Sequence, residues 1–88
     1  MCTWITKRSR MTGSGKGPTG WMPLTHATVY FDHPYHAPLD HTLNIDFVNE
    51  DRGPGARVAV ELSADSARAL VRDIEVALAA GEAAHATG

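Results

Sequence analysis

Two short segments alternate between apolar and polar residues with a period of two, and this pattern constrains the fold more than any other feature. In residues 42–48, leucine, isoleucine and phenylalanine alternate with polar side chains. Residues 56–62 repeat the pattern with alanine, valine and leucine on one side. Such alternation is typical of a strand with one buried face. The polar run between them contains Gly53-Pro54-Gly55, which predicts a hairpin connection longer than two residues.

Weaker patterns predict the rest of the sheet. Residues 27–32 alternate in the same way and predict a third strand, and residues 2–7, rich in Thr, Trp and Ile, predict a fourth. The Gly/Ser/Thr-rich segment 9–20 is predicted to be a flexible loop. Residues 21–24 are predicted to form a short edge segment, because Pro23 cannot donate to a strand ladder.

One convincing helix is predicted over residues 64–80. Ser63 is the expected N-cap, and Gly81 stands where a C-capping glycine belongs. Residues 82–88 are expected to fray. Apolar residues recur at helical spacing, with Ile74 at the centre of the stripe and expected to be buried. The stripe consists of Ala67, Leu70, Val71, Ile74, Ala77 and Leu78.

These elements predict a single domain over residues 1–88 with an α+β fold. The expected architecture is an antiparallel sheet of about four strands with one C-terminal helix packed on its apolar face. A single helix leaves the other sheet face open to water, a ligand or another subunit. A chain of 88 residues also has little core, so we expect a homodimer, formed through the open face or an edge strand.

Composition narrows the class of protein. The chain is 43% hydrophobic with a formal net charge of −2, which gives no reason to expect a nucleic-acid partner. Four basic residues gather near the start, where a solvated basic segment is expected. A single cysteine excludes an internal disulfide, and no apolar run approaches the ~20 residues that span a bilayer. A cytoplasmic protein without a membrane partner is therefore expected.

Four of the five histidines fall within 16 residues, between His26 and His41. Imidazole works near neutral pH as a proton carrier or metal ligand. His33, His36 and His41 have a spacing suggestive of a divalent transition metal such as zinc, although it matches no established zinc signature. The alternative is a surface loop whose histidines are solvated or cap backbone groups. Strict alternation places His41 on the apolar side with Leu43, so a metal site on the polar face would need a bend.

The open polar face is the second place to look for a site. Its candidate ligand-binding residues are His26, Tyr30, Asn44 and Asp46. Cys2 is a candidate nucleophile that a nearby histidine could activate. The competing interpretation of Cys2 is a small apolar residue on an N-terminal strand.

Several segments together resemble a known family. They are Met1–Thr3, Ser14–Gly17, Ala27–Pro34, His41–Phe47 and Ala56–Leu62. The chain resembles a family of small uncharacterised proteins from high-GC bacteria, which carries a domain-of-unknown-function label. The resemblance covers nearly the whole chain through the helix. It implies a free-standing, single-domain bacterial protein and transfers no catalytic residue.

Three functions remain open on the sequence. The leading one is binding of a metal ion or small molecule through a His/Asp cluster. The second is a small enzyme that uses histidine as acid or base, with Cys2 as nucleophile. The third is a structural or interaction module whose polar face is an interface.

Overall fold

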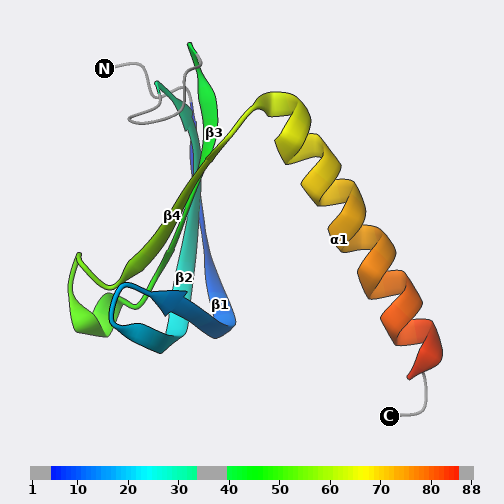
Figure 1. The fold of residues 1–88 in the computed structure, drawn as a ribbon, viewed down its shortest axis with the longest axis horizontal. Helices are drawn as coiled ribbons and strands as arrows, with labels where there is room; N and C mark the ends of the chain where they lie inside the picture. Colours follow the sequence, from blue (N-terminus) through cyan, green and yellow to red (C-terminus); the bar gives the residue numbers. More distant parts are fainter. Residues whose placement is uncertain (1–4, 34–39, 86–88) are drawn as a thin grey trace.

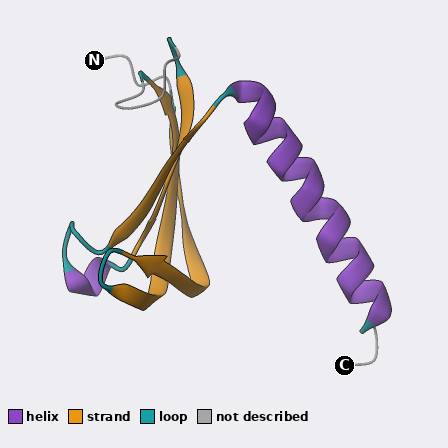
Figure 2. Cartoon of the chain, in the orientation of Figure 1, coloured by secondary structure: helices purple, strands orange, loops and turns teal. Residues whose placement is uncertain are grey.

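The computed structural model describes residues 5–33 and 40–85, and it confirms the predicted α+β fold (Figures 1 and 2). Within these residues, four strands form one antiparallel sheet, one 3₁₀ turn lies between the last two strands, and one long helix follows the sheet. The elements are β1 (Thr6–Gly17), β2 (Gly20–Asp32), β3 (Thr42–Val48), η1 (Glu50–Arg52), β4 (Arg57–Leu62) and α1 (Ala64–Ala84).

The strands lie in the order β1-β2-β3-β4, so each pairs with its neighbour in sequence. Directly opposed residues share a face of the sheet. Val29, Ile45 and Val60 are opposed across β2, β3 and β4, and they define the apolar face. One residue along, Thr28 and Asp46 are opposed on the polar face. The predicted sorting of side chains between the two faces is therefore present.

The prediction of a flexible loop over residues 9–20 is wrong. This segment belongs to a long hairpin in which Gly17 pairs with Gly20, and only Pro18 and Thr19 form the turn. Proline suits the second position of a turn because its φ is already fixed. Gly20 has a φ of 116°, which only glycine adopts readily. The glycine content suggested a flexible loop, whereas Gly20 here allows a tight turn between two paired strands.

The tip of the β1–β2 hairpin bends over the beginning of β4 (Figure 1). A register shift between Arg10 and Gly13 produces the bend. At Gly15, an added Cβ would lie 3.1 Å from a Leu24 methyl carbon and 3.5 Å from one of Val58. The missing side chain therefore allows the hairpin to close one end of the apolar face. Met22, which lies in the bent part of β2, is 7% exposed.

Helix α1 begins as predicted and ends later than predicted. The Ser63 hydroxyl accepts a hydrogen bond from the Ser66 amide at 3.1 Å, which caps the helix. Gly81 lies inside the helix, since α1 continues to Ala84. The expected fraying from residue 82 is thus wrong for residues 82–84, where alanine and glutamate sustain the helix. Residues 86–88 lie outside the described residues.

The expected packing of the helix against the sheet is present only at its first turns. Ala64 and Ala67 lie beside Phe31 and Leu43, around a space of about 220 Å³. Every described residue from 70 to 85 is exposed, and Ile74, expected at the centre of a buried stripe, is 49% exposed. Only Ser63 separates β4 from α1, and after this short link the chain turns back and the helix diverges from the sheet (Figure 1).

This divergence makes the chain extended for its length. The radius of gyration is 14.8 Å, whereas a compact domain of this size has about 12 Å. Among the described residues, Met22 and Ala27 are the buried hydrophobic side chains. The isolated chain therefore buries little apolar surface.

Asn49 holds the β3–β4 connection against the sheet. Its side-chain amide donates to the Pro23 carbonyl at 2.8 Å, and its side-chain oxygen accepts from the Asp51 amide at 2.9 Å. The residue is 4% exposed, so water cannot replace these bonds. Asn49 thus fixes the start of η1 to β2.

We expect Asn49→Ala to lower the free energy of unfolding by about 1–3 kcal/mol, because it removes both side-chain hydrogen bonds of a buried residue, each worth about 0.5–1.5 kcal/mol. Urea denaturation followed by circular dichroism measures this loss. Asp51→Ala is the matched control, since its exposed side chain can be removed while its backbone amide remains. Equal stability of Asn49→Ala and the wild type would show that these bonds do not hold the connection.

Candidate functional site

The polar face of the sheet contains a hollow of about 560 Å³. This volume lies within the range of about 300–1,000 Å³ that is usual for small-molecule sites. Three of the four candidate ligand-binding residues line it. Its polar and small side chains come from β2, β3 and β4, and they are Tyr30, Asn44, Asp46, Arg57, Ala59 and Glu61.

The strand register explains why the hollow lies here. Tyr30, Asn44 and Glu61 occupy one row across the sheet, and Asp46 with Ala59 occupies the next. On β4, the small side chain of Ala59 stands between two long polar ones, because residues 57, 59 and 61 alternate outward. Ala59 is exposed, so the depression opens to solvent.

Asp46 is the polar centre of this hollow. Its carboxylate accepts a hydrogen bond from the Tyr30 hydroxyl at 3.4 Å and lies 3.5 Å from an Arg57 guanidinium nitrogen. The Asp46 side chain is 15% exposed, and that of Arg57 is 53% exposed. Both contacts are long, so neither partner saturates the carboxylate.

Asn44 is held rigidly beside Asp46. It is 3% exposed, and its side-chain oxygen accepts a hydrogen bond from the Thr42 hydroxyl at 2.8 Å. Thr42 has no exposed surface. This bond assigns the oxygen of the Asn44 amide toward Thr42 and its NH₂ group away from Thr42.

Arg57 and Glu61 were not singled out as site residues from the sequence. The sequence did contain a sign of their position, because alternation in residues 56–62 already placed both side chains on the polar face. Choosing them required the pairing partners of that strand, which place Glu61 opposite Asn44 and Arg57 close to Asp46.

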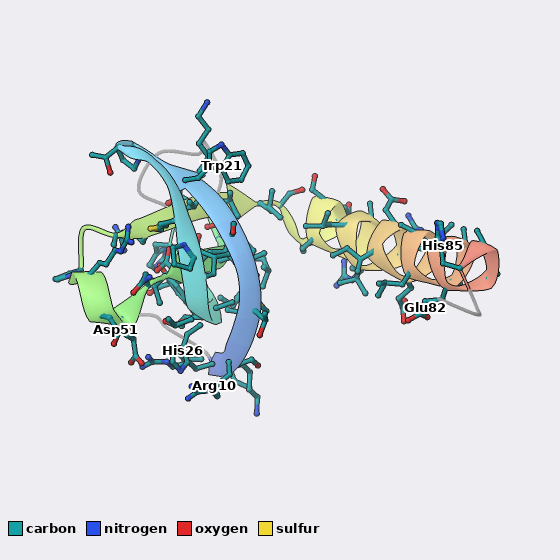
Figure 3. All side chains as sticks on the ribbon, turned by 90° about the horizontal axis from the view of Figure 1, so that it is seen from below. Arg10, Trp21, His26, Asp51, Glu82 and His85 are labelled. Carbon is teal, nitrogen blue, oxygen red and sulfur yellow. The ribbon has the colours of Figure 1, made fainter. Side chains whose placement is uncertain are left out.

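His26, the fourth candidate, lies outside the lining of this hollow. Its Nδ1 atom lies 3.0 Å from the Thr25 hydroxyl and 3.2 Å from a Glu50 carboxylate oxygen. Glu50 also pairs with Arg8, so the three side chains bind η1 to the first two strands. Figure 3 shows His26 beside the strand that carries Arg10, away from Trp21. These contacts give His26 a structural role.

His33 and His41 meet at the opposite end of the sheet. Their ring centroids are 4.7 Å apart, with planes inclined by 28°, and His41 also stacks on Phe31 at 5.7 Å. Phe31 belongs to the apolar face, so His41, which stacks on it, lies on that face as well. Strict alternation predicted this position, and no bend turns His41 toward the polar face. His33 Nδ1 also lies 3.0 Å from the Asp40 carbonyl oxygen, to which it can donate.

This stacking does not form a metal centre. A ring nitrogen directs its lone pair in the ring plane, so two nearly parallel rings do not direct lone pairs at one ion. Residues 5–33 and 40–85 contain no group of three or more His, Cys, Asp or Glu side chains that could hold a metal ion. His36 and Cys2 lie outside the described residues, so a role for either stays a prediction.

The chain matches one protein family over nearly its whole length. A family of unknown function, DUF6295, matches residues 1–87. The chain belongs to this family. The match confirms the resemblance to a domain-of-unknown-function family. No curated protein and no solved structure matches the chain.

In the part of the chain that the structure describes, no helix combines the length and apolarity that crossing a membrane demands.

We expect Thr42→Val to lower the free energy of unfolding by about 1–3 kcal/mol, because it removes the donor that satisfies the buried Asn44 oxygen. Chemical denaturation measures the change. Thr28→Val is the control on the same face, and surface substitutions of this kind usually stay within about 0.5 kcal/mol. A loss at position 42 no larger than that at position 28 would refute a positioning role for Thr42.

Proposed function

We propose that this protein binds a small amine-bearing molecule in the hollow on the polar face. The observation that carries the proposal is the convergence of Tyr30, Asn44, Asp46 and Glu61 around one depression of suitable volume. Ligand sites combine a concave surface with a few fixed polar groups, and this hollow has both.

The charge of the lining favours a cationic ligand. Two carboxylates, Asp46 and Glu61, oppose one guanidinium, that of Arg57. The guanidinium is about half exposed and lies at the long distance of 3.5 Å from Asp46. An ammonium group between the carboxylates would gain charge-assisted hydrogen bonds, which are stronger than neutral ones. The Asn44 amide and the Tyr30 hydroxyl would orient the rest of the molecule.

The other interpretations have less support. The metal hypothesis would need His36, because the described His33 and His41 stack on each other. The enzyme hypothesis would need Cys2 or a histidine in the hollow, and its described lining has no histidine. A cytoplasmic location in a high-GC bacterium completes the proposal, which is a binding protein of the cell interior.

Three four-carbon compounds test the ligand class: 1,4-diaminobutane, erythritol and succinate. They match in length and differ in charge. At a concentration of about 100 times its Kd, a ligand stabilises the folded state by about 2.7 kcal/mol. A domain of this size then shows a rise in Tm of about 10–20 °C. We expect diaminobutane alone to produce this rise, and calorimetric titration gives its Kd.

The Asp46→Asn variant should abolish the rise in Tm with diaminobutane, because it removes the central carboxylate. Asp73→Asn makes the same charge change on the exposed helix and should leave the rise intact. If diaminobutane stabilises neither the wild type nor the control, or if it stabilises Asp46→Asn equally, the proposal is wrong.

Filling the hollow gives an independent test. Ala59→Leu should block diaminobutane binding sterically while the exposed position tolerates the larger side chain. Ala83→Leu adds the same atoms to an exposed position on α1 and should not affect binding. Undiminished binding by Ala59→Leu would place the ligand elsewhere.

A further inference from the structure

A second cleft lies between the turn of the β1–β2 hairpin and the connection from β3 to β4 (Figure 1). Its volume is about 360 Å³, near the lower end of the range of about 300–1,000 Å³ for small-molecule sites. Hairpin residues 17–22 line one wall, and Arg52 with residues 55–57 lines the other. Among the described residues, this cleft shares only Arg57 with the polar hollow, so the two are separate sites.

The charge of this cleft differs in sign from that of the hollow. Its described lining contains two arginines, Arg52 and Arg57, and neither aspartate nor glutamate. Lys16 is opposed to Trp21 in the hairpin, so the two side chains share a face and a third cation lies close to the cleft. A concave surface lined by one sign of charge attracts ligands of the other sign. The cleft therefore favours an anion.

Arg52 is the arginine best placed to hold that anion. It ends η1, which the buried Asn49 caps, and its backbone amide donates to the Asn49 carbonyl at 3.2 Å. Within residues 5–33 and 40–85, its guanidinium forms no ion pair with a carboxylate. A guanidinium matches two oxygens of a phosphate at once. The backbone of Arg52 is thus fixed while its charged group remains available.

Gly55 leaves the wall beside Arg52 open. Its φ is not positive, since Gly20 and Gly53 are the glycines with positive φ among the described residues. A Cβ added at Gly55 would meet no atom within 4 Å. Neither backbone conformation nor packing therefore requires glycine here. The missing side chain instead allows a ligand to approach the backbone of the connection closely.

Trp21 gives the cleft a surface for a flat ring. It lines the cleft and is 70% exposed, the largest exposed fraction among the exposed large hydrophobic residues that the structure describes. Aromatic side chains stack on nucleobases and similar rings, because every such ring has a π-face. Trp21 and Arg52 line the same small cleft, so a single ligand can contact both.

We propose that this cleft binds a small phosphate monoester that carries an aromatic ring, such as a nucleoside monophosphate. Arg52 holds the phosphate, the open backbone at Gly55 admits it, and Trp21 stacks on the ring. Arg57 adds positive charge, since it is half exposed and its contact with Asp46 is long. The carboxylates of the polar hollow take no part, so this site is independent of the proposed amine ligand.

Calorimetric titration with adenosine monophosphate, adenosine and ribose 5-phosphate tests the ligand class. The monophosphate has both the ring and the phosphate, whereas each of the other compounds has one of them. We expect the monophosphate to bind at least about tenfold more tightly than either, because charge-assisted hydrogen bonds and ring stacking both contribute. Absence of monophosphate binding at millimolar concentrations overturns the proposal, as does equal binding of adenosine or of ribose 5-phosphate.

Two substitutions assign the contacts to the two parts of the ligand. Arg52→Gln should weaken monophosphate binding by about tenfold, the effect of losing one charge-assisted hydrogen bond. Arg72→Gln makes the same charge change on the exposed helix and should leave the affinity unchanged. Trp21→Ala should weaken binding of the monophosphate but not of ribose 5-phosphate. Unchanged monophosphate affinity in either Arg52→Gln or Trp21→Ala contradicts the proposal.

Filling the cleft tests its location without changing any charge. Gly55→Leu should block monophosphate binding, whereas Gly13→Leu should not, although an added Cβ meets no atom within 4 Å at either position. Circular dichroism verifies that both variants fold. Diaminobutane titration of the same variants keeps the two sites distinct, because neither position lines the hollow. Undiminished monophosphate binding by folded Gly55→Leu, or equal loss in Gly13→Leu, would refute this site.

Discussion

The register between β3 and its two neighbours is the constraint on which the rest of this structure depends. It opposes Ile45 to both Val29 and Val60, and this single pairing assigns every side chain of the three strands to a face. A slip of one residue would exchange the faces, exposing the apolar residues and burying Asp46. The hollow and the apolar face are thus consequences of one alignment, which the Asn49 anchor to β2 helps to hold.

The sequence was informative where one local pattern decided the outcome. The alternation in residues 42–48 predicted β3 with its exact bounds, and Ser63 predicted the start of α1. The alternation in residues 27–32 and 42–48 also placed Tyr30, Asn44 and Asp46 on a common face, where the structure brings them around one hollow. The first two inferences need only the geometry of a single element, and the third needs only the alternation within each strand.

Inferences that required the mutual position of two elements were less successful. The hairpin through residues 9–20 depends on a turn at Pro18 and on close packing at Gly15, neither of which alternation reveals. The histidine spacing suggested a shared metal, but Phe31 lies next to His41 and favours ring stacking. The amphipathic stripe of α1 was assigned to the nearest sheet, although amphipathicity states only that a helix needs an apolar partner.

Strand β1 has a charge pattern that opposes edge-to-edge pairing between molecules. It is an edge strand, and its exposed backbone groups could pair with the same edge of another molecule. Lys7, Arg8, Arg10 and Lys16 lie along it, so two such edges would bring like charges together at every attempt. The other edge, β4, has only six residues and offers a short template. The charges on β1 therefore oppose fibril-like growth through this edge of the sheet.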